Sequence, residues 1–176
     1  MLPNGNYEVG VHIADVTHFL RADSAIDKEA SHRCTTVYLV DRRTDMLPGL
    51  LTEDLCSLRS KVDRLAFSVV WEINAKNGRV VSSKFGKSVI HSKASLTYQQ
   101  AQDRIDDKKD SSGITKGLRI LNNVAKMLKK ERNKAGALTL ASTQVKFDFD
   151  QETHNPTDVT FYSMLETNSL VEEFML

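Results

Sequence analysis

Three side chains near the start of the chain are of types that can hold a metal ion: His12, Asp15 and His18. Positions three residues apart on a β-strand face opposite sides of a sheet, so these groups converge only if the strand ends at about Ala14. We therefore expect no metal site in this chain. Asp15 is more simply explained as the residue that caps a turn after the strand.

Positive charge is concentrated in residues 114–135, where apolar residues recur at helical spacing. The apolar stripe comprises Leu118, Leu121, Ala125 and Leu128. The cations are Lys116, Arg119, Lys126, Lys129, Lys130, Arg132 and Lys134, with the acid Glu131 among them. Two interpretations stay open: a solvated helix face, or contact with phosphates along an RNA path, which weakens steeply with salt. Arg42 and Arg43 admit the same two interpretations.

The composition is that of an ordinary globular protein, with 176 residues, 40% hydrophobic and 27% charged. Twenty-four Lys and Arg oppose 23 Asp and Glu, so the formal charge of +1 neither requires nor excludes a nucleic-acid ligand. The sequence has no apolar run near the ~20 residues that cross a bilayer, and no secretory signal at its start. We expect no membrane partner.

The two cysteines, Cys34 and Cys56, lie outside any CxxC pattern or Cys/His cluster. Isolated thiols favour a reducing compartment, and a single disulfide between them stays open as the alternative. A zinc site is disfavoured because four ligands at suitable spacing are lacking.

Alternating apolar residues predict a strand over residues 7–14, after a turn at Asn4 and Gly5. Residues 65–73 and 79–85 predict a hairpin around a turn at 76–78, with an extension through Val89 and Ile90. Further strands are expected over 35–40, 145–149 and 157–161, and a polar turn over 41–45.

Helices are expected from a cap at Ser24 to Arg33, after Pro48 to Leu55, from a cap at Ser95 or Thr97 to Ile105, over 114–135, and from about Leu165. Residues 15–22 are expected to be irregular. The fold class is α+β, a mostly antiparallel sheet with packed helices. The strand over 7–14 is expected to have a partner before residue 1, and the last helix to continue beyond residue 176.

Several short stretches carry a resemblance to a known family. They are residues 8–16 (EVGVHIADV), 35–39 (TTVYL), 46–48 (MLP), 55–59 (LCSLR), 63–68 (DRLAFS), 92–98 (SKASLTY), 136–140 (GALTL) and 168–175 (NSLVEEFM). In order and approximate spacing they are similar to the RNB catalytic domain of ribonuclease II-type exoribonucleases. Within this family, these stretches most resemble those of the catalytic subunit of the eukaryotic RNA exosome.

The resemblance implies a 3′-to-5′ exoribonuclease that hydrolyses single-stranded RNA processively to nucleoside 5′-monophosphates. It implies two-metal phosphodiester hydrolysis with Mg²⁺. The implied partners are single-stranded RNA and the exosome core subunits, in RNA processing and decay. The implied location is nuclear and cytoplasmic.

In this family the metal-holding carboxylates come from an Asp-Ile-Asp-Asp-like run just before the strand that starts near Tyr7. Residues 1–6 read MLPNGN instead. We therefore expect residues 1–176 to be a partial RNB domain without the aspartate-rich motif and without the C-terminal part. The catalytic residues are expected upstream of Met1, so this chain alone is expected to bind no Mg²⁺ and to be inactive.

Two positions correspond to the family's clamp on the terminal base. Tyr38 matches an aromatic that stacks on the 3′-terminal base, and stacking suits an enzyme that reads no sequence because every base has a π-face. The alternative is a core tyrosine on a strand. Leu140 matches the residue on the other side of the clamp, which is a Phe in bacterial ribonuclease II. A Leu can pack on a base but cannot stack on it as a ring. Packing of Leu140 in the core is therefore an equal alternative.

Three charged residues complete the implied RNA contacts. Glu172 matches an acidic residue that contacts the last ribose, and a carboxylate that accepts from a 2′-hydroxyl distinguishes RNA from DNA. Its alternative is a solvated helix glutamate. Arg59 and Lys93 are placed to reach phosphate, or else to make structural ion pairs.

Two other classes of function stay open. One is a non-catalytic RNA-binding or scaffold module with the same fold. The other is a self-contained α+β interaction domain, which would unfold cooperatively without an exposed strand edge.

Overall fold

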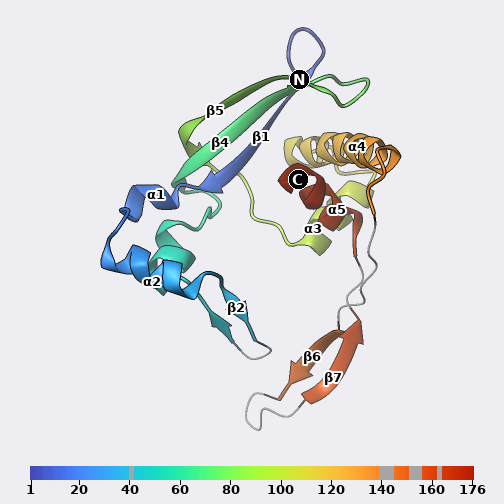
Figure 1. Cartoon of the computed structure of the whole chain (residues 1–176). Coiled ribbons are helices and arrows are strands. Elements are labelled where there is room, and N and C mark those ends of the chain that lie inside the picture. The colour runs from blue at the N-terminus through green and yellow to red at the C-terminus, as the bar shows by residue number, and fades with distance from the viewer. Residues whose placement is uncertain (40–41, 139–144, 151–155, 162–163) are drawn as a thin grey trace. The chain divides into compact units, whose positions relative to one another are not determined.

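The computed structural model describes residues 1–39, 42–138, 145–150, 156–161 and 164–176 (Figure 1). The chain forms two compact units, Met1–Leu96 and Thr97–Leu176. The first contains β1 (Tyr7–Ala14), α1 (Val16–Phe19), α2 (Ala25–Arg33), β2 (Val37–Tyr38), β3 (Arg43–Thr44), the π-helix η1 (Leu50–Leu55), β4 (Asp63–Ile73) and β5 (Val80–His91). The second contains α3 (Tyr98–Asp106), α4 (Gly113–Lys134), β6 (Val145–Phe149), β7 (Pro156–Phe161) and α5 (Glu166–Met175).

The first unit is organised around an antiparallel sheet in the order β1-β4-β5. β4 is central and pairs with β1 from Tyr7↔Ile73 to Ala14↔Ala66, and with β5 from Asp63 to Ile73. The alternating apolar residues predicted the three strands, and the predicted hairpin of β4 with β5 and its extension are confirmed. The pairing of β1 with β4 was not predicted. Every pair of named strands in the described part of the chain is antiparallel, which confirms the expected α+β class.

The turn before β1 is held to the sheet by amide side chains. Gly5 has φ +83°, which a residue without Cβ adopts at little cost, and its N–H donates to the Leu2 carbonyl at 3.0 Å. The Asn4 and Asn6 side chains donate to Glu72 Oε1 at 2.8 and 2.5 Å. These hydrogen bonds lower the pKa of Glu72 and fix the predicted Asn4–Gly5 turn beside β4.

Three predictions in the first unit are partly wrong. The strand expected over 35–40 contains only Val37 and Tyr38 among the described residues, because neither side chain is buried and the pairing with β3 stops after two positions. Its partner β3 lies in what was expected to be a polar turn. Residues 15–22, expected to be irregular, include the single helical turn α1.

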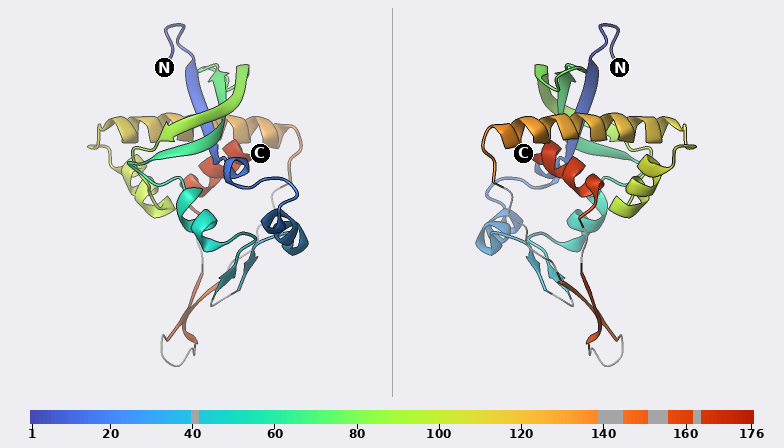
Figure 2. Two further views of the ribbon diagram at one scale, coloured as in Figure 1. Left: turned by 90° about the vertical axis from the view of Figure 1, so that its left-hand side faces the viewer. Right: turned by 90° about the vertical axis from the view of Figure 1, so that its right-hand side faces the viewer.

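The second unit consists of three helices in contact, α4 with α5 and both with α3, and a β6–β7 hairpin (Figure 2). Thr97, rather than Ser95, caps α3 in a capping box with Gln100. Ser112 caps α4 by accepting from Thr115 N at 3.3 Å. Ala125 of the predicted stripe is buried, while its members Leu118, Leu121 and Leu128 are half-buried. Val124, which was not predicted, is also buried, as is Leu170 of α5.

The loop before α4 is held by Asp110. Its Oδ2 accepts from the Thr115 hydroxyl at 2.6 Å and its Oδ1 from the Ser112 N–H at 2.8 Å. The Thr115 hydrogen bond is the main cause that lowers the pKa of Asp110 from 3.8 to about 2.

The Asp110 carboxylate therefore gives a testable pH dependence. A carboxyl with a lowered folded-state pKa stabilises the fold above its unfolded pKa, and this contribution is lost as pH falls from 3.8 to about 2. We expect Asp110→Asn to flatten the decline of the urea unfolding midpoint across that range. Asp106→Asn, at the C-terminal end of α3, is the control, and an equal flattening there would contradict the assignment.

Candidate nucleic-acid interface

Tyr38 lies at the end of β2 with 77% of its surface exposed. The neighbouring Val37 and Leu39 are also about half exposed, so three successive apolar side chains are accessible to solvent. The core-tyrosine alternative is therefore wrong. An exposed ring on a short hairpin is suited to stacking against a flat ligand.

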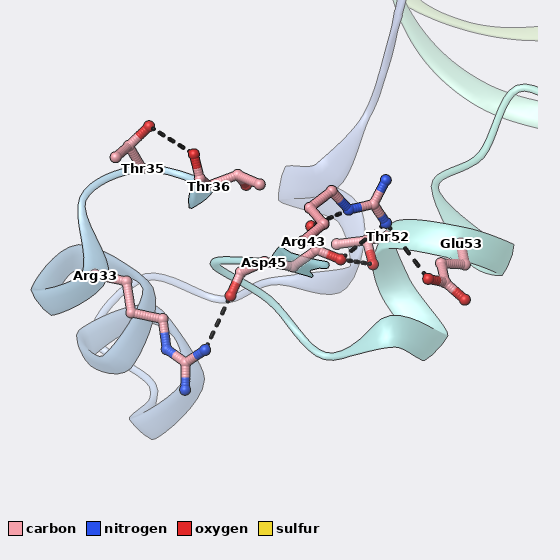
Figure 3. Close-up of polar contacts among 7 residues, drawn as sticks. All are labelled: Arg33, Thr35, Thr36, Arg43, Asp45, Thr52 and Glu53. Carbon is pink, nitrogen blue, oxygen red and sulfur yellow. Dashed lines mark hydrogen bonds and ion pairs between the residues drawn. The ribbon is translucent and has the colours of Figure 1, made fainter. Parts of the chain in front are cut away.

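The strand β3, which pairs with β2, is anchored by ion pairs and hydrogen bonds (Figure 3). Arg43, which pairs with Tyr38 across the ladder, contacts Asp45 at 2.6 Å and Glu53 of η1 at 3.4 Å. Asp45 also accepts from the Thr52 hydroxyl at 3.1 Å, and its carbonyl accepts from Arg33 of α2 at 2.9 Å. The hydrogen bond to Asp45 raises the pKa of Arg43. These contacts fasten β3 to both α2 and η1 and so position Tyr38.

Arg59 is brought to the same π-helix. Its guanidinium donates to the Glu53 carbonyl at 2.7 Å and lies 3.3 Å from Asp54, which also pairs with Arg64. Its side chain remains 53% exposed. The structural ion pair expected as an alternative is therefore present, while part of the guanidinium remains open to a ligand.

Lys93 and Arg42 differ from Arg59 and Arg43. Both are exposed, and neither side chain has an ion pair or hydrogen bond among the residues that the structure describes. Phosphate contact by Lys93 remains a prediction. The alternative, a structural ion pair, is not present in the part of the chain that the structure describes.

The potential metal ligands at the end of β1 are engaged elsewhere. His12 Nδ1 lies 2.6 Å from Ser68 Oγ, which in turn contacts Ser88 Oγ at 2.6 Å. Asp15 is buried, accepts from the Thr17 hydroxyl at 2.6 Å and pairs with Lys87 of β5 at 3.0 Å. Asp15 precedes α1, but its side chain makes no capping bond to a backbone N–H, so the capping prediction is wrong in that respect.

The described residues contain no group of three or more His, Cys, Asp or Glu placed to hold a metal ion. The clustered carboxylates that a two-metal site requires are therefore not found among these residues. Both cysteines are free thiols, so the disulfide alternative is absent. Burial is the main cause that raises the pKa of Cys56, with the Asp15 charge adding to it.

The Lys87–Asp15 ion pair gives a second testable pH dependence. The Thr17 hydrogen bond and Lys87 together lower the pKa of Asp15, so its charged form stabilises the fold above the unfolded pKa and the contribution is lost in acid. We expect Lys87→Met to lower the unfolding midpoint at neutral pH and to reduce its acid dependence. Lys76→Met, in the exposed turn between β4 and β5, should leave both unchanged, and equal effects would contradict the pair's role.

Glu172 and Glu173 of α5 have opposite surroundings. Glu173 is buried and accepts from Arg132 of α4 at 2.6 and 3.2 Å. Glu172 keeps 45% of its side chain exposed and lies 3.7 Å from Arg132. Glu173 therefore has a structural role, while the Glu172 carboxylate is accessible for the predicted ribose contact.

The basic residues of α4 are partly used inside the second unit. Arg119 donates to four carbonyls, those of Arg104, Ile105, Asp107 and Asp110. Lys126 pairs with Glu166 at 2.8 Å, which lowers the pKa of that carboxyl, and Lys129 donates to Ser169 at 2.7 Å. A uniformly solvated face is therefore wrong for these residues. The acidic residues on the helix expected from about Leu165 were the sequence feature that could have indicated these ion pairs.

The predicted RNA contacts fall on different parts of the chain. Tyr38, Arg59 and Lys93 belong to the first unit. Tyr38 and Arg59 are linked through Glu53 of η1: the strand partner of Tyr38, Arg43, donates to the Glu53 carboxylate, and Arg59 donates to the Glu53 carbonyl. Glu172 belongs to the second unit. Leu140 lies outside the described residues.

A family model described as the RNB domain matches residues 1–176. The chain belongs to the RNB domain family. This RNB chain is 57% identical over 175 residues to the exosome complex exonuclease RRP44 of Mus musculus, a match that covers 99% of the chain and 18% of the relative. It is 56% identical over 176 residues to the exosome complex exonuclease dis3 of Schizosaccharomyces pombe, covering 100% and 18%. The RNB chain thus spans 18% of the length of these relatives.

Solved structures support the same fold. RNase R of Mycoplasma genitalium, in complex with ribose methylated single-stranded RNA, has a TM-score of 0.90 at 25% identity, over 99% of the RNB chain and 27% of that chain. Yeast Ssd1, described as a pseudonuclease, has a TM-score of 0.68 at 24% identity, over 81% and 17%. The second likeness concerns the fold alone. The predicted family and its α+β fold are confirmed.

Within the described ranges of the RNB chain, no helix combines the length and the apolar character that crossing a bilayer requires.

Proposed function

We propose that this chain is the RNA-holding part of the catalytic domain of an exosome-type 3′-to-5′ exoribonuclease. The observation that carries the proposal is the RNB match over the whole chain, together with 56–57% identity to exosome exonucleases over 175–176 residues. The substrate is single-stranded RNA, degraded to nucleoside 5′-monophosphates. The exposed Tyr38 and the accessible Glu172 carboxylate suit a base and a ribose respectively.

The proposal assigns metal chemistry to residues outside this chain. Mg²⁺ held by carboxylates upstream would activate water and stabilise the charge that develops on the phosphate. The residues of this chain would bind and orient the RNA. Exosome core subunits are the proposed partners of the longer enzyme, and nucleus and cytoplasm its proposed locations.

A chimera tests this proposal directly. In the mouse relative, the 175 aligned residues are replaced by the aligned residues of this chain. We expect the chimera to shorten 5′-labelled single-stranded RNA stepwise from its 3′ end in Mg²⁺, with no cleavage in a chelator. The chain alone should bind the RNA without cleaving it. The unmodified mouse protein serves as the reference.

Two outcomes would count against parts of the proposal. Binding without turnover by the chimera would favour a non-catalytic RNA-binding or scaffold module. Robust hydrolysis by the chain alone would show that its own side chains supply the metal ligands.

A further inference from the structure

Beyond the contacts above, the C-terminal half of α4 carries a shallow groove of about 580 Å³. The described residues that line it are Lys126, Lys129, Lys130, Asn133 and Lys134. Four of these five side chains are cations and none is an acid. An open surface with this composition attracts negatively charged ligands.

The positions of the lysines follow the helix. Lys126, Lys130 and Lys134 recur every four residues, so they lie on one face, each about 6 Å along the axis from the next. Lys129 lies beside them. A row of cations at this spacing offers successive contacts to a ligand with repeated negative charges, rather than one site for a single small anion.

The charge of the groove is only partly neutralised. Lys130 is exposed and has no ion pair or hydrogen bond in the described part of the chain. Lys129 donates to the neutral Ser169 hydroxyl, so its charge stays uncompensated by that contact. The Lys134–Glu131 pair has both side chains more than half exposed, and such pairs exchange readily for a competing anion.

The groove is continuous with a second hollow. A pocket of about 310 Å³ between α4 and α5 shares Lys126 and Lys129 with it and is otherwise lined mainly by Ala125, Leu165 and Leu170 together with polar side chains. In that pocket Lys126 forms an ion pair with Glu166. The free positive charge therefore lies on the groove side, toward Lys130 and Lys134.

We infer that this lysine groove binds the phosphodiester backbone of single-stranded RNA, as a contact additional to the base and ribose contacts at Tyr38 and Glu172. The inference rests on the proposed function, since it takes the same RNA as ligand. Lysine supplies point charges without base recognition, so the contact is independent of sequence and weakens with salt. An acidic peptide is the competing occupant that the experiment must distinguish.

The test is the salt dependence of RNA binding by the 176-residue chain, measured by fluorescence anisotropy with a labelled oligouridylate. Each phosphate neutralised on a single strand contributes roughly 0.7 to the slope of log K against log salt. We expect Lys130→Gln with Lys134→Gln to make the slope shallower by about 1.4. Lys130→Arg with Lys134→Arg should restore it, because arginine keeps the charge.

The matched control is Lys108→Gln with Lys109→Gln, which removes two exposed charges from the loop before α4 of the same unit. It should leave the slope unchanged. An unchanged slope in the groove variant, or an equal change in the loop variant, would overturn the inference. So would loss of polyglutamate binding in the groove variant with RNA binding intact. Failure of the unmodified chain to bind RNA would overturn this inference, whereas failure of the chimera to hydrolyse RNA would overturn the proposed function, so the two failures are distinguishable.

Discussion

Replacement of Arg132 by methionine is expected to destabilise the helical unit severely. The Glu173 side chain is 3% exposed and its two oxygens accept from one guanidinium at 2.6 and 3.2 Å. Methionine would leave a buried carboxylate without a cation, which is far more costly than losing a surface pair. Allowing for the 31% exposure of Arg132, we expect the unfolded-to-folded ratio at a fixed urea concentration to rise at least roughly tenfold.

The measurement is equilibrium urea unfolding followed by circular dichroism. Lys134→Met is the control, because its pair with Glu131 is exposed on both sides and should contribute little. Arg132→Met with Glu173→Met should recover much of the loss, since no orphaned charge remains. Equal, small effects of Arg132→Met and Lys134→Met would show that the Glu173 pair is not structurally important.

Tyr38→Ala is expected to weaken binding of single-stranded RNA by roughly 1–3 kcal/mol, the usual contribution of one stacked base. The ring is 77% exposed and its neighbours in the network, Arg43 and Asp45, do not depend on it for their ion pair. The unfolding midpoint should therefore stay constant while affinity falls. Anisotropy titration of the chain with a labelled oligonucleotide measures the change.

Tyr38→Phe separates stacking from hydrogen bonding. It keeps the aromatic ring and should bind RNA like the unmodified chain. If Tyr38→Ala binds normally, or if Tyr38→Phe loses as much affinity as Tyr38→Ala, the stacking role is wrong.

Local sequence signals accounted for most of the elements. The β4–β5 hairpin was predicted because alternation and a Lys76–Asn77–Gly78 turn agree, and Thr97 was one of two predicted caps for α3. The β2 strand was overestimated because β-branched and aromatic residues signal a strand even where no buried face supports it.

The partners of charged residues were harder to predict, since they depend on tertiary contacts. Lys87 meets Asp15 only because β4 lies between β1 and β5, an order that no local pattern specifies. Likewise, helical spacing placed Lys126 and Arg132 on α4 but not beside Glu166 and Glu173 of α5. The RNA contacts proposed for Tyr38 and Glu172 rest on the family resemblance, because a lone tyrosine or glutamate in a sequence does not indicate RNA binding.

The strand order of the first unit has a consequence for its dynamics. β4 is hydrogen-bonded on both sides, so detachment of either neighbour leaves its other row of amides protected, and its amides should be among the slowest of the unit to exchange with deuterium. The β2–β3 hairpin is paired at two positions only and should open far more readily. Tyr38 thus sits on a segment that should open more readily than the sheet, and for the RNA contact proposed above this freedom would let its ring follow bases of different size.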